Sequence, residues 1–516
     1  MADRPSNQPH SNVTIHYEAD GTRVVSRTLK NDQGDVFIIE HRFPDTIVHH
    51  YQPSLEDEDV PLYSGQFHFS DREDRPFSGD VFFTWQPTPR ISAKGSRTST
   101  PQEIAEIFES GDSGNGIWRT VPGLSIPLTG AVIPKQPEDV SETSQPSGDL
   151  HVEEQVQTQV GAGESLTDVT FLVPNGWQAL DASRVCDPDA PEIFWDGRTT
   201  ATGDGWTVQF DLLPGLTHKK WSRLKKIGGY SFTHTGRLTR TDGASFSSTE
   251  AFSALERISL ALSLAMGRRT ACLLPVGYSN GLPKWTHWAT APIDPMKSSS
   301  DWLESTCSAK QIGDLIHCVL NFTRTKENLR AFRNALAYYI AANVDVDVHL
   351  KASLPISGLQ LLTYYEFVTI GPYSPRQWGQ AIPKARGTEW EVRNLIDKLG
   401  ITIAVPRHFK HLAAVRDRMR RKGAKRDALG VVIKMRNVAT HPTKQQSGDY
   451  AVYEWAEAGM LANYWLCLAL LYTVGYKGDV AAVLQPRPRH PGELRGTPWE
   501  AKPAKRWRVG GKPERH

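Results

Sequence analysis

Hydrophobic and polar positions alternate along the first half of the chain. Val13, Ile15 and Tyr17 occupy every second position, and the same period returns along residues 206–212. Successive side chains of a β-strand point to opposite faces, so a period of two is typical of strands with one buried face. Asp-Gly and Ser-Gly dipeptides, which favour tight turns, separate these stretches. The pattern predicts a β-rich, sandwich-like antiparallel region over residues 1–250.

One part of this region lacks the alternation. Residues 134–165 are poor in large apolar side chains and rich in Pro, Gln, Ser, Glu and Gly. A segment of this composition buries too little apolar surface to offset the conformational entropy that ordering removes. We therefore expect a flexible segment at about 134–165, which would divide the β-rich region in two.

After residue 250 the spacing changes to that of helices. Phe252, Leu255, Ile258 and Leu262 recur at steps of three and four, as in an amphipathic helix. The same spacing predicts helices over residues 309–323, 326–342, 353–369, 388–399, 408–421, 424–440 and 449–475. The last helix is expected to supply the core seam of a helical bundle through Tyr453, Ala456, Met460, Tyr464, Cys467, Leu471 and Val474.

These patterns predict an α+β multidomain fold. The β-rich N-terminal half, residues 1–250, is followed by a connecting helix and hairpin over residues 251–308. A C-terminal α-helical bundle then occupies residues 309–480, and a basic, flexible tail occupies residues 481–516.

The composition says more about the number of domains and the cellular compartment of the protein than about its function. The chain has 516 residues, of which 39% are hydrophobic, enough for two or three folded domains. Lys and Arg number 59 against 57 for Asp and Glu, so any argument for a polyanionic partner must be local. Five cysteines without CxxC spacing fit a reducing compartment. With no apolar leader and no apolar run of membrane-spanning length, we expect a cytoplasmic protein that does not enter a membrane.

Two short motifs suggest chemistry but fit better as ordinary structure. Residues 277–281, GYSNG, match the nucleophile pattern G-x-S-x-G, which requires a helix immediately after the serine. The residues that follow include a proline and alternate like a strand, so we predict a hairpin turn at Asn280-Gly281 instead. His408 and His411 have the spacing of two zinc ligands on one helix, but no further ligand lies at a suitable offset, so we predict no metal site and no cofactor.

A run of cations lies just before the helix predicted over residues 424–440. Such a run is either a solvated surface or a contact for nucleic-acid phosphates, and the sequence favours neither. The candidate RNA-binding residues are Arg416, Arg418, Arg420, Arg421, Lys422, Lys425 and Arg426.

The string RNVATH at residues 436–441 ends that helix and is followed by Pro442. A helical wheel predicts that Arg436 lies at the border of an inward-facing apolar stripe and that Asn437 faces away from it. The residues of this stripe are Val431, Val432, Met435, Val438 and Ala439.

On an unbroken helix Arg436 and His441 would lie roughly 140° apart and could not easily share one phosphate. The residue before a proline is pushed out of the helical region, so the helix should end at about Thr440. His441 is then free to turn back toward Arg436.

This string and its setting resemble those of HEPN domains, helical bundles whose active members carry an Arg, four to six further residues and a His. Arg436 and His441 fit with four residues between them, and Asn437 supplies the polar residue that often follows the arginine. The resemblance covers roughly residues 310–480. The β-rich N-terminal half followed by such a bundle also resembles, more loosely, bacterial phage-defence proteins of the ApeA type.

The resemblance implies a metal-independent endoribonuclease that cleaves single-stranded RNA through attack of a 2′-hydroxyl on the adjacent phosphorus. Arg436 would bind the phosphate, His441 would transfer protons, and Asn437 would orient the histidine or the RNA. A homodimer would place two such motifs together, and the N-terminal half would sense a phage-derived or other activating ligand. A non-catalytic RNA- or protein-binding module of the same fold is the alternative. The sequence specifies neither the RNA cleaved nor the trigger.

Overall fold

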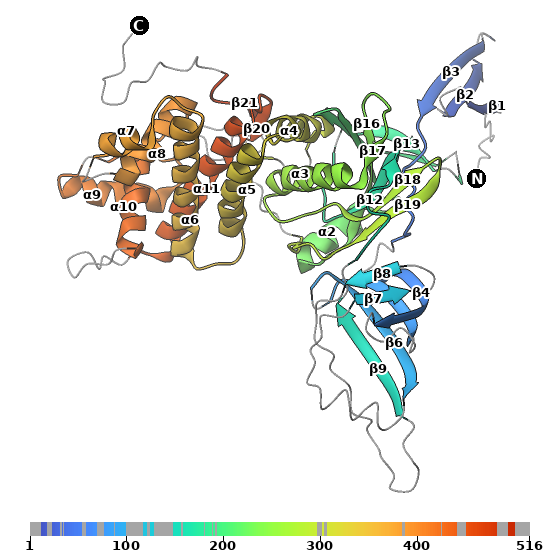
Figure 1. Cartoon of the computed structure of the whole chain (residues 1–516). Helices are drawn as coiled ribbons and strands as arrows, with labels where there is room; N and C mark the ends of the chain where they lie inside the picture. The colour runs from blue at the N-terminus through green and yellow to red at the C-terminus, as the bar shows by residue number, and fades with distance from the viewer. Residues whose placement is uncertain are drawn as a thin grey trace, which may run out of the picture.

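The computed structural model has an α+β fold, with antiparallel sheets in its N-terminal half and helices dominating its C-terminal part (Figure 1). It describes residues 12–17, 23–30, 34, 36–53, 58–69, 77–86, 88–99, 117–120, 124–127, 148–155, 158–179, 181–187, 189–190, 193–296, 302–303, 307–383, 387–424, 426–440, 450–481 and 494–500. The predicted division into a β-rich half and a helical part is confirmed at this level.

An eight-stranded antiparallel sheet forms the centre of the β-rich half, in the order β10-β19-β18-β12-β16-β15-β14-β13. Both faces of this sheet are covered, because Phe171 and Val173 belong to the apolar core that contains helix α3 (Ser248–Met266), whereas Leu172 between them belongs to a second core. The strands are β10 (Thr158–Val160), β12 (Asp168–Pro174), β13 (Ser183–Cys186), β14 (Phe194–Gly203), β15 (Trp206–Leu212), β16 (Phe232–Arg240), β18 (Leu273–Ser279) and β19 (Leu282–Trp288).

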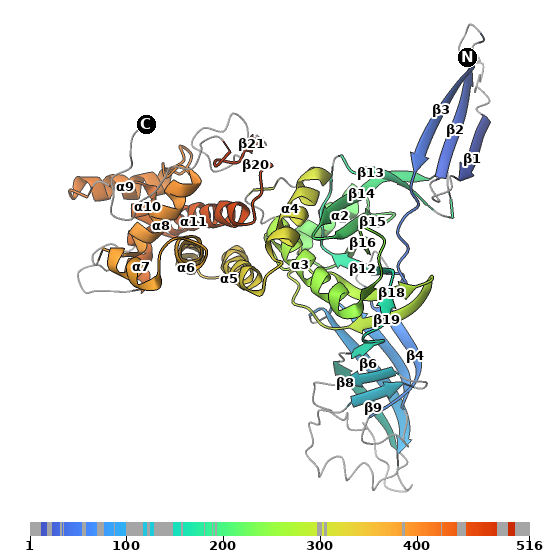
Figure 2. The ribbon, with the colours of Figure 1, turned by 45° about the horizontal axis from the view of Figure 1, so that its top comes forward.

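The second core lies between the central sheet and a six-stranded sheet of order β8-β7-β4-β5-β6-β9. Its strands are β4 (Val60–Phe69), β5 (Phe77–Thr84), β6 (Arg90–Ser99), β7 (Ile117–Thr120), β8 (Leu124–Pro127) and β9 (Gly148–Gln155). A three-stranded sheet of β1 (Asn12–Tyr17), β2 (Arg23–Lys30) and β3 (Val36–Phe43) lies at the end of the molecule opposite the last helices (Figure 2). The pair β11 (Ser165–Leu166) and β17 (Phe246–Ser247) is antiparallel.

Three predictions for the β-rich half need correction. Residues 251–308 are not a connector, because α3 packs into the core of the central sheet and β18 pairs with β12 inside it. Within the segment 134–165, which was expected to be flexible, β9 pairs with β6 and β10 pairs with β19; residues 134–147 lie outside the described residues. Helix α2 (His218–Ile227) interrupts the region predicted to be all β, because its ten residues are too few for a clear helical period.

The hairpin prediction at Asn280-Gly281 is confirmed. Strands β18 and β19 pair from Val276 opposite Thr286 to Ser279 opposite Leu282, with a register shift between Gly277 and Tyr278. Asn280 and Gly281 both have positive φ, 52° and 75°, as a two-residue turn that matches the twist of the strands requires. The serine of GYSNG therefore belongs to a strand end and not to a nucleophile elbow.

The helices of the C-terminal part follow the predicted ranges closely. Helix α4 begins after Ser308, whose side chain and that of Gln311 form a capping box. The helices are α4 (Ala309–Phe322), α5 (Lys326–Asn343), α6 (Val348–Tyr364) with the π-helical turn η1 (Tyr365–Thr369), α7 (Pro375–Ala381), α8 (Gly387–Leu399), α9 (Lys410–Arg421), α10 (Ala428–Thr440) and α11 (Val452–Thr473). Helix α7 was not predicted.

Helix α11 is the centre of this bundle and packs against α5, α6, α8, α9 and α10. Its second half is buried on all sides, which explains why residues 464–474 are almost entirely apolar. The apolar core of the bundle is continuous with the core between α3 and the central sheet. The described residues contain no helix long and apolar enough to cross a membrane.

The end of the chain is more ordered than predicted, as far as it is described. Strand β20 (Asp479–Ala481) pairs with β21 (Leu494–Gly496), and Trp499 Nε1 donates a hydrogen bond to the Tyr476 carbonyl at 2.9 Å. A flexible tail from residue 481 is therefore wrong for residues 494–500.

Candidate functional site

Arg436 lies just before the last turn of α10, a helix packed against α6, α8, α9 and α11. Val431, Val432 and Met435 are buried, as the helical wheel predicts, and they fix which side of α10 faces the bundle. Arg436 lies at the border of this face and is half-buried. The predicted apolar stripe ends sooner than expected, because Ala439 is exposed.

The guanidinium of Arg436 has unused hydrogen-bonding capacity. Its Nη1 donates to Oδ1 of Asn437 at 3.2 Å, while its Nε is buried and has no hydrogen-bond partner among the described residues. Burial holds the pKa of Arg436 below its usual value, because the charged form loses contact with water. Within the part of the chain that the structure describes, no carboxylate forms an ion pair with Arg436. The site therefore presents a half-buried cation that a bound anion would stabilise.

Asn437 is less exposed than the helical wheel predicted. The wheel placed it facing away from the bundle, but it is half-buried and accepts a hydrogen bond from Arg436. Its predicted role of orienting His441 or RNA stays a prediction. His441 lies outside the described residues, so its distance from Arg436 stays a prediction.

The basic run, the cations between Arg416 and Arg426, contains side chains that are ion-paired with carboxylates and side chains that are exposed and unpaired in the described chain. Arg418 donates two hydrogen bonds to Glu454, at 2.6 and 2.9 Å, and Arg426 donates one to Glu389 at 3.0 Å. Arg416 is paired with its neighbour Asp417 at 3.0 Å. These three cations have carboxylate partners, and Lys425 lies outside the described residues. The exposed cations without an ion pair in the described chain are Arg420, Arg421 and Lys422.

His408 and His411 do not share a helix face. Helix α9 begins at Lys410, so His408 precedes it, and its ring packs edge-on against Phe409. The exposed ring of His411 stacks on Tyr453 with centroids 5.3 Å apart. Among the described residues, no three His, Cys, Asp or Glu side chains are grouped so as to hold a metal ion.

The chain is similar to YopA. Residues 161–299 match the family model described as the YopA central domain, and residues 326–493 match that of the YopA C-terminal domain. The "SPbeta prophage-derived uncharacterized protein YopA" of Bacillus subtilis (strain 168) is 22% identical over 429 residues, which cover 82% of this chain and 91% of that protein. No solved structure matches the chain. Neither the family descriptions nor the relative's name states an activity.

The two YopA matches correspond to the two main structural parts. The first contains most of the central sheet together with α3, and the second begins at α5 and contains Arg436. Helix α4 lies between the two matches and packs against α3 and β14.

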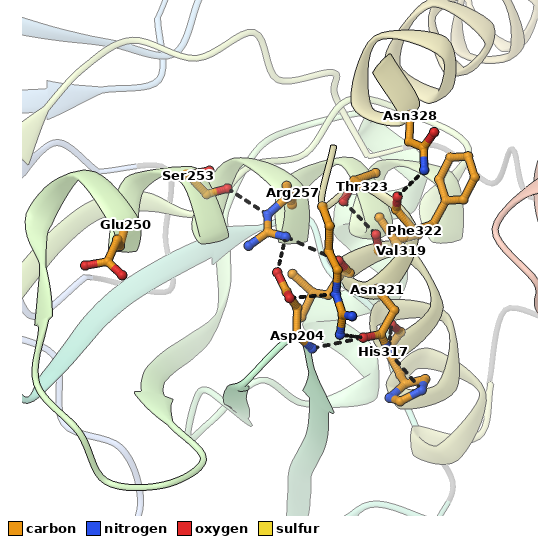
Figure 3. A network of polar contacts seen from close by, with 12 residues as sticks. Asp204, Glu250, Ser253, Arg257, His317, Val319, Asn321, Phe322, Thr323 and Asn328 are labelled. Atoms are coloured by element: carbon orange, nitrogen blue, oxygen red, sulfur yellow. Dashed lines mark hydrogen bonds and ion pairs between the residues drawn. The ribbon is translucent and has the colours of Figure 1, made fainter. Parts of the chain in front are cut away.

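A polar network joins the YopA central-domain match to the end of α4 (Figure 3). Asp204, in the turn between β14 and β15, accepts a hydrogen bond from Arg257 of α3 at 2.6 Å and pairs with Arg324 at 2.7 Å. The backbone N–H of Asp204 donates to the Asn321 side chain at 3.1 Å. Nothing in the sequence indicates this network, because its members come from segments more than 50 residues apart.

The first half of α11 exposes apolar side chains that were predicted to be core. Tyr453 is 68% exposed and Met460 is 50% exposed, whereas Tyr464, Cys467 and Leu471 are buried as predicted. The period of the stripe was correct, but periodicity does not show where a neighbouring helix stops covering it. Exposed apolar side chains on one helix face are typical of a protein-interaction surface.

Proposed function

We propose that the helical part is a metal-independent, HEPN-type endoribonuclease that cleaves single-stranded RNA. The observation that supports it most is the state of Arg436. A half-buried arginine with a buried, unpartnered Nε is unfavourable by itself and becomes favourable when an anion binds. An RNA phosphate matches the planar fork of the guanidinium, which binds two phosphate oxygens at once.

The proposed reaction needs one cation and one proton carrier. His441, in its neutral form, takes the proton from the RNA 2′-hydroxyl, whose oxygen attacks the adjacent phosphorus. The bond from phosphorus to the 5′-oxygen breaks, the 5′-oxygen receives the proton that His441 took, and a 2′,3′-cyclic phosphate remains. Arg436 stabilises the charge that grows on the phosphate oxygens, and Asn437 holds its guanidinium in position. An unperturbed imidazole with a pKa near ~6.5 suits this proton transfer at neutral pH.

The exposed cations at the end of α9 would guide the RNA strand. Arg420, Arg421 and Lys422 are exposed, and α9 packs against α10, which carries Arg436. Contacts of this kind add affinity without sequence specificity and weaken as salt rises. We propose these three residues, in place of the whole run from 416 to 426, as the RNA-contacting set.

We further propose that the active form is a homodimer. The chain carries one R-x4-H string at 436–441, and a second copy would supply a second histidine and arginine to one cleft. The exposed side chains of Tyr453 and Met460 lie on α11, which packs directly against α10. A second copy covering this face would bring the two motif-bearing helices together.

The proposed setting is bacterial, cytoplasmic and linked to phage. The Bacillus subtilis relative is prophage-derived by name, and this is our ground for proposing a setting linked to phage. A nuclease of this kind would act in phage defence or in a toxin-like response, and the N-terminal half would lower its rate of cleavage, without abolishing cleavage, until an activating ligand binds.

The test is cleavage of a fluorescently labelled single-stranded RNA by the full chain in EDTA. We expect wild type to cut it, and Arg436→Ala and His441→Ala to be inactive while folded. Arg330→Ala is the matched control, because Arg330 is also a helical arginine but is exposed and lies on α5. Activity that survives both Arg436→Ala and His441→Ala would refute the assignment.

The second candidate is a non-catalytic module that binds RNA or protein. The exposed Tyr453 and Met460 favour protein binding, because they place two large apolar side chains on one helix. Wild type that binds RNA in a salt-dependent way without cutting it, or that neither binds nor cuts RNA, would favour this candidate.

A further inference from the structure

A pocket of about 670 Å³ lies between α3, the hairpin β18–β19 and α5. The first two elements belong to the YopA central-domain match and α5 to the C-terminal match, so the pocket lies where the two parts meet. Its volume falls in the range of ~300 to 1,000 Å³ typical of small-molecule sites, which favour such junctions. Neither Arg436 nor any residue of the basic run lines it.

The interior of this pocket is apolar. Its hydroxyl groups are already satisfied, since Ser259 Oγ donates to the Leu255 carbonyl at 2.7 Å and accepts from the Cys272 N–H at 3.0 Å. Ser263 is satisfied in the same way by the backbone of Thr270. The interior therefore suits a ligand with an apolar body. The apolar side chains that line it include Leu255, Leu260, Leu274, Pro292, Leu336 and Ile340.

One wall of the pocket is held in an uncommon backbone conformation. Leu274 has a φ of 50°, a left-handed value rarely adopted by residues other than glycine, at a bulge where β18 shifts its register against β12. The buried ring of His49 fixes it. His49 Nε2 donates to the Leu274 carbonyl at 3.0 Å, while Nδ1 lies 3.1 Å from the Tyr51 N and 3.0 Å from the Tyr51 carbonyl oxygen. Strained residues held in this way concentrate at binding sites.

Charged side chains line the mouth of the pocket. Arg333 of α5 pairs with Glu256 of α3 at 2.6 Å, with both side chains close to half exposed. Arg269 is also half exposed and pairs at 3.8 Å with Asp294, which does not line the pocket. The lining itself therefore carries two cations and one carboxylate, that of Glu256. His287 adds no charge at neutral pH because burial lowers its pKa, and its buried Nδ1 has no hydrogen-bond partner.

We propose that this pocket binds an amphipathic anion, a molecule with an apolar chain and a carboxylate head. The chain lies between α3 and α5, and the carboxylate takes the place of Glu256 as the partner of Arg333. Because Arg333 and Glu256 belong to the two YopA matches, binding exchanges a contact between the two parts for a contact with the ligand. The inference does not depend on the proposed nuclease activity.

Calorimetric titration of the full chain with decanoate tests the proposal. We expect saturable binding of one decanoate per chain and none of decyltrimethylammonium, which has the same chain and the opposite charge. Glu256→Gln should tighten decanoate binding several-fold, because it releases Arg333, whereas Arg333→Gln should weaken it at least tenfold. Both variants break the same ion pair, so a merely structural effect would move both in one direction, and that result would overturn the proposal.

A second pair of variants tests whether decanoate binds inside this pocket. Ala337 lines the pocket from the exposed side of α5, and Asn334 is exposed on the same helix but does not line it. We expect Ala337→Trp to abolish decanoate binding and Asn334→Trp to leave it unchanged, with both variants melting like wild type. Unchanged binding by Ala337→Trp, or the absence of saturable binding by wild type, would overturn the proposal.

Discussion

The carboxylate of Glu454 receives two hydrogen bonds from the guanidinium of Arg418, at 2.6 and 2.9 Å. The same carboxylate accepts the Ala451 N–H at 3.0 Å, next to the start of α11. Arg418 therefore fastens α9 to α11, and the bond to its guanidinium is the main reason that the pKa of Glu454 lies below its usual value. Arg418 was predicted from the sequence as an RNA contact, but in the structure it links two helices.

Arg418→Ala should destabilise the protein by about 1 to 3 kcal/mol, because it leaves the buried Glu454 carboxylate without its partner. Arg420→Ala is the control, since Arg420 is exposed on the same helix, and its effect should stay within about 0.5 kcal/mol. Urea denaturation followed by circular dichroism measures both. Equal stability of the two variants would contradict a structural role for Arg418.

Arg436→Ala should behave in the opposite way. Its guanidinium has no carboxylate partner in the described chain and donates one hydrogen bond, to Asn437, so its loss should cost no more than about 1 kcal/mol. RNA cleavage should nevertheless fall to background if Arg436 binds the phosphate. A loss of stability as large as that of Arg418→Ala would show that Arg436 holds the bundle together instead.

Acid should destabilise the β-rich half through His49. Burial lowers its pKa from 6.5 to about 4, so between these values the unfolded chain binds more protons than the folded one. The contribution of His49 is complete above pH 6.5 and is lost as the pH falls toward 4, by roughly 3 kcal/mol at ~1.4 kcal/mol per pKa unit. His49→Gln should flatten this part of the curve of unfolding free energy against pH. A curve that keeps the same slope in His49→Gln would contradict this role of His49.

Asp204→Asn should loosen α4 from the central sheet. It removes the negative charge shared by Arg257 and Arg324, and Arg257 is only 9% exposed, so we expect a loss of about 2 to 4 kcal/mol. Asp196→Asn breaks an ion pair whose two side chains are both more than half exposed, and should cost less than about 1 kcal/mol. Urea denaturation compares the two, and equal losses would contradict the proposed importance of the network.

Replacing Tyr453 and Met460 with glutamate should convert the proposed dimer to a monomer without lowering its melting temperature. Both side chains are already exposed, so the change should not disturb the core, but charges on this face oppose its burial by a second copy. Light scattering measures the mass, and Leu282→Glu, at an equally exposed position on the β18–β19 hairpin, is the control. A wild-type chain that is monomeric at micromolar concentration would contradict the dimer.

The sequence predicted the helices well because their signals are local. Helix α4 was expected over residues 309–323 and spans Ala309–Phe322, with its capping box in the four residues that begin at Ser308. The order of the central sheet could not be predicted in this way. Strand β12 lies between β16 and β18, and these pairings depend on contacts between residues far apart in the chain.

The candidate site shows the same limit. The run of cations could be recognised in the sequence. The ion pairs of Arg418 and Arg426 could not be predicted, because their carboxylate partners lie 36 and 37 residues away in the chain. The half-buried position of Arg436 was predicted from helical phase alone, because Val431, Val432 and Met435 fix the inward face of α10.

The apolar core that joins α3 and the central sheet to α4, α5 and α11 has no boundary between the two YopA matches. Calorimetry should therefore record one melting transition for these parts, with equal calorimetric and van't Hoff enthalpies. A truncation that begins at residue 326 would expose the apolar face of α5 that packs on α3, and should yield insoluble protein. If the helical part is a toxic nuclease, cutting the chain before α5 would then not release it in active form, and its control would have to act on the intact chain.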